Sequence, residues 1–246
     1  MREVWRMWRY STMVVLTVLT AGLFAAILIP FKGIPLVPGV TELRPANVIP
    51  VVFGMLFGPA GAWGSALGNL IGDFFSTLGI GTFFGFWGNF LAAYLPYKMW
   101  QGRDPGQLSR SLPRFGLAAL LGAMACALAI GFGLELFLLL PFSVIGLAVL
   151  LNNAVVALAL APFLLRLLAP RVSRWDLAWQ EQMDPEDRLP GPAPRLGLIL
   201  VWLGAGGGYV LGLMVSFGVL SLGAGQPLSL LLAPFVIVLG LGCWLL

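Results

Sequence analysis

The sequence predicts an all-α integral membrane protein, and three observations support this prediction. Hydrophobic residues make up 59% of the 246-residue chain, charged residues only 10%, and the mean hydropathy is +0.95. Soluble domains contain about 25% charged residues, so this composition lies far outside their range. The apolar runs are about twenty residues long, which is the length of a transmembrane helix and not of the alternating strands of a barrel.

Eight apolar segments follow one another along the chain, and each is predicted to be a helix. The second and third are separated because Gly58, Pro59 and Gly61 stand between them, and proline and glycine interrupt helices. The first has no small-residue cleavage signature after it, so we expect a retained span and not a signal peptide. The predicted segments are 12–30, 48–57, 61–75, 82–97, 115–134, 142–168, 196–220 and 228–246.

Basic residues gather in three clusters, and this predicts the topology. Twelve of the fourteen lysines and arginines precede the first apolar run or lie in 98–114 and 166–195; Lys32 and Arg44 are the exceptions. Cytoplasmic loops carry an excess of lysine and arginine. With a cytoplasmic N-terminus, eight crossings place all three clusters inside. A single helix over 48–75 would move the 98–114 loop outside, so the broken hairpin is favoured.

The chain is expected to have three parts. Residues 1–168 form a six-helix membrane domain, and 196–246 form a C-terminal extension of two membrane helices. Between them, 169–195 is rich in Asp, Glu, Arg and Pro. We expect a cytoplasmic linker without packed structure, because such composition is typical of interdomain segments.

The composition excludes several classes of chemistry. Histidine is absent, and the two cysteines, Cys126 and Cys243, lie in apolar runs and are interpreted as small buried hydrophobes. No metal site, cofactor or catalytic triad is therefore expected. The only lysines are Lys32 and Lys98, and neither follows a glycine, so the chain has no phosphate-binding loop for ATP. Although the pI is near 9.5, the basic residues lie in loops and do not indicate nucleic-acid binding.

The segment GSALGNLIGDFFST, which begins at Gly64, carries two stripes along one apolar helix. Residues four apart share a helix face, so Gly64, Gly68 and Gly72 form a bare ridge suited to close packing. Asn69 and Asp73 lie on the ridge beside it. A carboxylate inside a membrane-length segment is costly, and such a residue marks a functional site by default.

Under the predicted topology, polar residues from four helices and one loop gather in the outer half of the bilayer. This pattern indicates a pocket open to the outside, with aromatic walls and a few polar groups. The candidate ligand-binding residues are Glu42, Arg44, Asn47, Asn69, Asp73, Trp87, Asn89, Glu135, Asn152 and Asn153.

Each candidate also has an interpretation without a ligand. Asp73 and Glu135 are equally consistent with hydration at the membrane interface. Asn152 and Asn153 fit polar contacts between helices. Glu42 and Arg44, two residues apart in a loop, fit mutual pairing.

Several motifs resemble those of the substrate-binding (S) components of energy-coupling factor (ECF) transporters, in particular the group of queuosine-precursor transporters. They are ELRPANVIP from Glu42, FGMLFGPAGAWG from Phe53, GNLIGD from Gly68 and FGFWGNFLAAYLPYK from Phe84. The resemblance covers about 11–168 and is most specific over 42–73. The C-terminal helix pair departs from the six-helix pattern.

This resemblance implies a multi-pass protein of the prokaryotic cell membrane that captures a vitamin-like or nucleobase-like micronutrient outside the cell. Such components topple in the membrane and work with a transmembrane coupling protein and ATPase subunits. The resemblance also implies that Ala21 and Ala25, an Ala-x-x-x-Ala pair on the first helix, dock on the coupling protein. It further implies that the loop 31–47 helps to gate the pocket.

Other functions remain open from the residues alone. A stand-alone ion-coupled secondary transporter would use Asp73 as its proton- or cation-linked carboxylate. This hypothesis is weakened because no charged residue is expected at mid-depth to relay a proton inward. A membrane enzyme would have to rely on Asp73 and Glu135 alone, so no enzymatic activity is predicted. A purely structural protein would make the polar pocket a coincidence.

Overall fold

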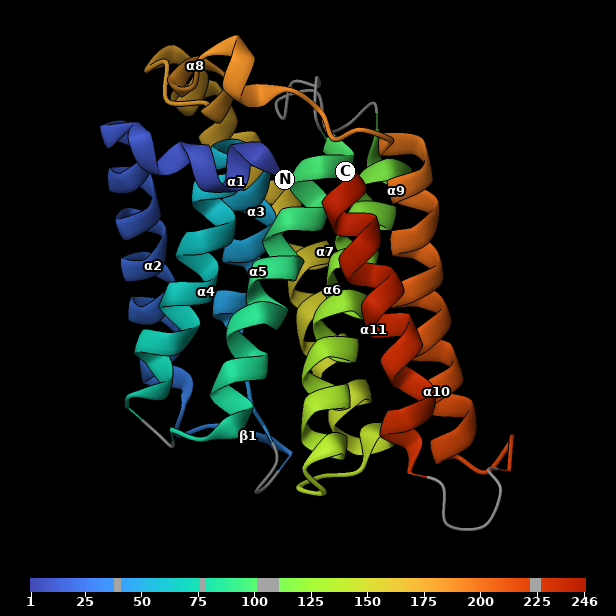
Figure 1. Cartoon of the computed structure of the whole chain (residues 1–246). Helices are drawn as coiled ribbons and strands as arrows, with labels where there is room; N and C mark the ends of the chain where they lie inside the picture. Colours follow the sequence, from blue (N-terminus) through green and yellow to red (C-terminus); the bar gives the residue numbers. More distant parts are fainter. Residues whose placement is uncertain (38–40, 76–77, 101–110, 222–226) are drawn as a thin grey trace.

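The computed structural model of the chain describes residues 1–37, 41–75, 78–100, 111–221 and 227–246. Its helices run side by side along one axis, and both termini lie at the same end of the bundle (Figure 1). We call this end the termini end. The opposite end carries a short hairpin and the connections that follow α4 and α6, and we call it the cavity end.

The described part of the first half of the chain contains four long or medium helices, three short helical turns and a short antiparallel hairpin. Its elements are α1 (Arg2–Arg6), η1 (Met7–Arg9), α2 (Ser11–Phe31), β1 (Pro35–Val37), β2 (Thr41–Glu42), η2 (Pro45–Asn47), α3 (Val48–Phe57), α4 (Pro59–Asp73) and α5 (Ile80–Trp100). In the hairpin, Pro35 pairs with Glu42. The sequence did not predict these two strands, because the pairing is brief and carries no alternating pattern.

The second half is also helical. Its elements are α6 (Leu112–Leu136), α7 (Phe142–Arg174), α8 (Trp179–Gln182), η4 (Pro185–Arg188), α9 (Pro194–Val201), the π-helical turn η5 (Trp202–Gly207), α10 (Gly208–Ser216) and α11 (Leu228–Leu245). Among the described residues, five helical segments are long and apolar enough to cross a membrane: Ser11–Phe31, Leu112–Leu136, Phe142–Gln182, Pro194–Ser216 and Leu228–Leu245. With the shorter apolar helices, they confirm the predicted all-α membrane fold.

The predicted break between the second and third helices is confirmed at Gly58. This residue has φ +56° and ψ −123°, a backbone conformation that L side chains rarely adopt. Pro59 follows at the first position of α4, where its missing N–H costs nothing. Helix α3 runs to the termini end and α4 returns to the cavity end (Figure 1). Helical segments therefore alternate in direction from α2 to α11.

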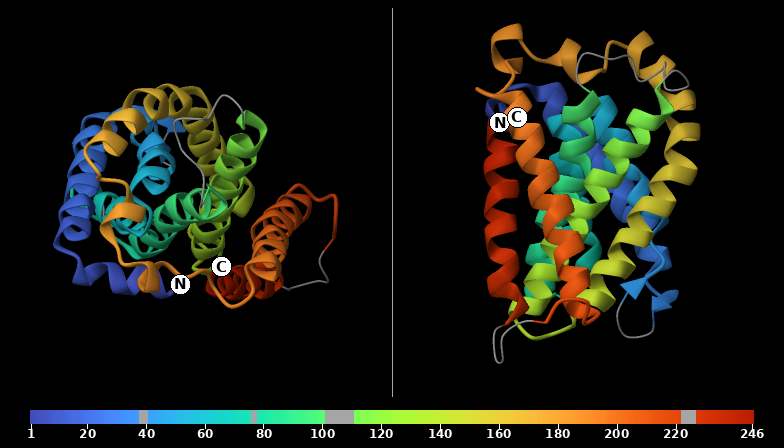
Figure 2. Two further views of the ribbon diagram at one scale, coloured as in Figure 1. Left: turned by 90° about the horizontal axis from the view of Figure 1, so that it is seen from above. Right: turned by 90° about the vertical axis from the view of Figure 1, so that its right-hand side faces the viewer.

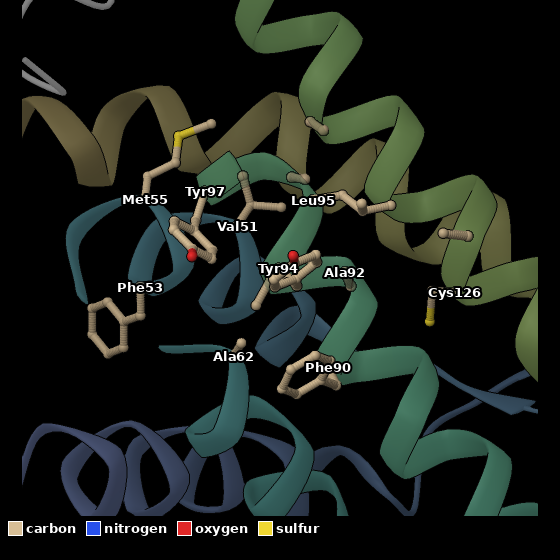
Figure 3. Packing of buried hydrophobic residues seen from close by; sticks show 14 of the residues in the cluster. Val51, Phe53, Met55, Ala62, Phe90, Ala92, Tyr94, Leu95, Tyr97 and Cys126 are labelled. Atoms are coloured by element: carbon tan, nitrogen blue, oxygen red, sulfur yellow. The ribbon is translucent and has the colours of Figure 1, made fainter. Parts of the chain in front are cut away.

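A row of aromatic side chains on α5 forms the centre of the core. Phe90 stacks on Tyr94 with ring centroids 5.7 Å apart, and Tyr94 meets Tyr97 edge to face. Figure 3 shows this row beside Val51 and Phe53 of α3. Because α5 packs against α3, α4 and α6, it is the central helix of the six-helix part.

The glycine ridge of α4 packs directly on α2. A Cβ added at Gly64 would lie 2.4 Å from the Cβ of Thr20, and one at Gly68 would lie 2.6 Å from the Cβ of Phe24. Ala21 and Ala25 belong to this packed side of α2 and are only 4% and 5% exposed. In the described structure this pair packs mainly against α4, and its docking role stays a prediction. The sequence fixes the spacing of small residues but not which side of the helix they face.

The expectation of an unpacked linker was wrong. Helix α7 continues to Arg174, and Trp179 and Met183 beyond it are 4% and 3% exposed. The Trp179 ring covers the α3–α4 break, since a Cβ at Gly58 would lie 2.6 Å from its Cγ. Asp187 accepts hydrogen bonds from Arg6 and from the hydroxyl of Tyr10. The buried side chains of Trp179 and Met183, together with the hydrogen bonds of Asp187, hold this polar segment against the termini end.

The C-terminal helices lie beside the six-helix bundle (Figure 2). Helix α11 packs on α6 and α9, while α10 packs on α6 and α7. Tyr94 donates a hydrogen bond of 2.9 Å to the carbonyl of Cys243, and Lys98 donates one of 2.7 Å to the carbonyl of Leu246. These bonds attach α11 to α5.

Candidate ligand-binding cavity

A cavity of about 310 Å³ opens at the cavity end of the bundle. This volume lies at the lower limit for small-molecule sites. Segment 42–47 and the connection that begins α5 form its rim, while α4, α5, α6 and α7 form its walls. Eight of the ten predicted ligand-binding residues line it: Glu42, Arg44, Asn47, Asn69, Asp73, Asn89, Asn152 and Asn153.

The polar ridge of α4 is anchored by an ion pair. Lys32, at the end of α2, lies with its Nζ 3.1 Å from Oδ1 of Asp73. Asn69, one turn earlier on α4, donates a hydrogen bond of 3.1 Å to the other carboxylate oxygen. Burying a carboxylate at membrane depth is costly unless it is paired, and here both oxygens have partners. The sequence did not identify Lys32 as that partner, although its isolation from the basic clusters was a signal.

Arg44 occupies the centre of the rim. Its Nη1 donates to Oδ1 of Asn69 at 3.3 Å, and its Nη2 lies 3.5 Å from a carboxylate oxygen of Glu42. Its Nε is buried and has no hydrogen-bond partner among the described residues. The pairing of Glu42 with Arg44 is therefore present, and both residues still line the cavity.

The asparagines on α5 and α7 differ in which polar atoms they leave free. Asn89 and Asn153 each donate from Nδ2 to the carbonyl one turn earlier, of Gly85 and of Val149, both at 2.9 Å. Their side-chain oxygens accept no hydrogen bond from the described residues, and both residues line the cavity. Asn152 instead uses both polar atoms on segment 42–44. Of these three, Asn89 and Asn153 thus leave amide oxygens without a partner among the described residues.

The charged groups at the cavity cancel. Lys32 pairs with Asp73, and Arg44 pairs with Glu42. The other polar lining groups are neutral amides and a hydroxyl, and Cys126, Ile130 and Val149 add apolar surface. Within the described part of the chain, no three His, Cys, Asp or Glu residues come together as a metal site. This arrangement suits reversible binding of a polar, uncharged molecule.

Two predicted residues lie elsewhere. Trp87 packs against Trp63 and Phe90 and lines an apolar groove between α5, α6 and α11. It stands two positions from Asn89, about 200° around the helix, so the two side chains face opposite sides. Glu135 accepts a 2.6 Å hydrogen bond from the backbone N–H of Phe142, and this caps the start of α7. Depth alone predicted both residues, and depth does not determine the direction of a side chain.

The apolar wall of the cavity was not predicted from the sequence. Cys126 and Ile130 of α6 line the cavity one turn apart, with Val149 opposite on α7. An apolar residue in an apolar helix carries no signal that distinguishes a cavity wall from the core. Gly85 was missed for a similar reason. A Cβ there would lie 2.9 Å from Nδ2 of Asn69, so glycine lets α5 approach the polar ridge of α4.

A family model described as the QueT transporter matches residues 14–170. The chain belongs to the QueT transporter family. This family is the S-component group of ECF transporters, as the motifs indicated, and its members are multi-pass membrane proteins of transport. No curated protein and no solved structure matches the chain. All residues that line the cavity fall inside the matched region of this QueT-family protein, and helices α9 to α11 fall outside it.

Proposed function

We propose that this QueT-family S component captures an uncharged, nucleobase-like micronutrient from outside the cell in the cavity between α4, α5, α6 and α7. The observation that supports the proposal is the set of amide groups that converge on one cavity whose charged residues are already paired. Such a site offers hydrogen-bond donors and acceptors without a net charge.

The orientation follows from the basic clusters. Lys98, Arg114, Arg171 and Arg174 lie on the parts of α5, α6 and α7 that reach the termini end, as does the N-terminal cluster. Cytoplasmic segments carry such an excess of basic residues. We therefore place the termini in the cytoplasm and the cavity mouth outside the cell.

The ligand class follows from the free polar atoms. A heterocycle with hydrogen-bond donors on its edge matches the side-chain oxygens of Asn89 and Asn153. A site built to pair such groups rejects analogues that lack them, because its own buried polar atoms would remain unsatisfied. A queuosine precursor of the deazapurine type is a ligand of this kind and fits the name of the family.

The chain has no phosphate-binding loop, so the energy for uphill transport must come from a partner or from an ion gradient. We propose that a transmembrane coupling protein and ATPases of an ECF module supply the energy, as for other S components. The accessible small residues of α2 are Gly22 and Ala26, one position away from the buried alanine pair. A Cβ at Gly22 would meet nothing within 4 Å, so this face is open to a second helix.

The decisive experiment measures binding and uptake separately. Purified protein without partners should bind a radiolabelled deazapurine base, and native mass spectrometry should detect a small molecule of this class that co-purifies. Uptake by cells should require the ATPases as well. If the protein binds the base and cells take it up without the ATPases, the protein is a secondary transporter. If the purified protein does not bind the base, the proposed ligand class is wrong.

A further inference from the structure

Asn152 differs from every other asparagine at the cavity in what its amide contacts. Its Nδ2 donates a 2.9 Å hydrogen bond to the carbonyl oxygen of Glu42, and its Oδ1 accepts a 3.3 Å bond from the backbone N–H of Arg44. The side chain is buried on α7. Both halves of the amide are therefore used on the backbone of one short segment, and neither is free for a ligand.

The segment held in this way crosses the cavity. While its backbone is bonded to Asn152 on α7, the side chain of Arg44 reaches Asn69 on α4 at 3.3 Å. Glu42, Arg44 and Asn47 all line the cavity, so this stretch forms part of its rim. A backbone attached to one wall and a side chain attached to the opposite wall make a strap across the mouth.

We infer that Asn152 is a latch that holds the 42–44 segment across the cavity and thereby sets how fast a ligand enters and leaves. Asn152 is then a positioning residue and not a ligand-binding one. The effect on ligand kinetics rests on the proposed function, whereas the latch itself does not. Loss of two neutral hydrogen bonds should increase opening of the strap about tenfold.

The chain contains its own reporter of this opening. Cys126 lines the cavity, about 15 Å along α6 from the end of that helix at Leu136, and because it is only 1% exposed a reagent reaches its thiol only when the cavity opens further. The other cysteine, Cys243, lies on α11 and lines the separate apolar groove. In a Cys243→Ala background, the rate at which a cationic, membrane-impermeant methanethiosulfonate reagent modifies Cys126 measures access through the mouth.

The experiment compares three variants in vesicles or detergent. Asn152→Ala removes both hydrogen bonds, and Asn152→Leu removes them while nearly conserving volume, so a packing defect alone cannot explain a shared effect. Both should accelerate modification of Cys126 about tenfold. Tyr209→Phe is the matched control, because it removes a hydrogen bond to the Gly146 carbonyl of α7 while Tyr209 lines neither the cavity nor the segment. Its labelling rate should stay within twofold of the parent.

An unchanged rate in both Asn152 variants, or an equal acceleration in Tyr209→Phe, would overturn the latch. Ligand kinetics use 7-deazaguanine as the probe. Its association and dissociation rates should both rise in the Asn152 variants, with a smaller change in Kd. Accelerated labelling with no detectable 7-deazaguanine binding would leave the latch standing and count against the proposed ligand class. Normal 7-deazaguanine binding with unaltered labelling would support the proposed ligand class and overturn the latch.

Discussion

Lys32 and Asp73 join the ends of two packed helices, with Nζ of the lysine 3.1 Å from Oδ1 of the aspartate. The pair closes the α2–α4 contact at the cavity end, where the glycine ridge of α4 ends at Gly72 against Leu28. Because Asn69 also bonds Asp73, this one carboxylate supports both the packing of α2 and the polar wall of the cavity.

Replacing one partner of this pair should therefore destabilise the protein. We expect Asp73→Leu to lower the free energy of unfolding by about 1–3 kcal/mol, less than for a fully buried pair because both side chains retain some exposure. Lys32→Met combined with Asp73→Leu should recover part of that loss. Thermal unfolding of the two single variants and the double variant in detergent gives the coupling energy. Strict additivity would show that the pair contributes nothing.

The pairing of charges at the cavity also predicts how ligand binding responds to salt. If Lys32 and Arg44 are neutralised by Asp73 and Glu42, an uncharged ligand gains little from long-range electrostatics. Between 50 and 500 mM NaCl, the Kd for a deazapurine base should change less than about twofold. Isothermal titration at several salt concentrations tests this. A steep loss of affinity with salt would indicate a charged ligand.

Packing of the linker should depend on pH through Asp187. Hydrogen bonds from Arg6 and then from Tyr10 hold the pKa of this carboxyl below its ordinary value of 3.8. A carboxyl with a lowered pKa stabilises the folded form above its ordinary pKa, and the contribution disappears as pH falls through the lowered value. Protection of the amides in 176–191, measured relative to their intrinsic exchange rates, should therefore fall at pH values below about 4. Asp187→Asn should show low protection already at pH 7 and little further dependence on pH.

The α3–α4 break gives a test of the contact between the linker and the bundle. Gly58→Ala should lower stability by about 1–3 kcal/mol, because an L side chain is strained at this φ and ψ and its Cβ meets the Trp179 ring. Trp179→Ala removes the steric part but not the backbone strain. The double variant should thus be more stable than the sum of the two losses predicts. Thermal unfolding of the two single variants and the double variant measures these losses. Strictly additive losses would contradict the contact between Gly58 and Trp179.

The two small-residue pairs on α2 should respond differently to a large side chain. Gly22→Trp should abolish uptake while the purified protein still binds its ligand, because the residue faces outward with nothing within 4 Å. Ala21→Trp should instead reduce the yield of folded protein, because Ala21 is packed inside. Parallel assays of uptake, binding and yield separate the two. Normal uptake with Gly22→Trp would exclude this face as the docking surface.

The sequence predicted most of the fold because membrane helices leave strong local signals. Long apolar runs marked the helices, and Gly58 with Pro59 marked the broken hairpin. Scarce charges made Asn69 and Asp73 conspicuous, and their spacing of four put them on one face. The scarcity of polar residues likewise drew attention to six further residues that line the cavity, whereas its apolar lining went unrecognised.

The remaining errors share one physical cause. Trp87 and Glu135 were assigned from depth, which does not fix the rotation of a helix about its axis, whereas the docking role of Ala21 and Ala25 came from the family resemblance and stays a prediction. That rotation depends on which neighbours pack against it, as the glycine ridge of α4 shows for α2. The linker was misjudged because Trp179 and Met183, two apolar residues among many polar ones, determine its packing. Tertiary contacts of this kind are not encoded in local composition.

The attachment of α11 to α5 has a mechanical consequence. Tyr94 and Lys98 bind carbonyls near the end of α11, and α10 rests on α6 and α7. In the transport cycle that we propose, a core that tilts within the lipid would carry these extra helices with it as a single rigid body. Each turnover would then displace the lipid around a bundle of eight segments. The transport rate should therefore depend more strongly on the thickness and fluidity of the bilayer than it does for a six-helix relative.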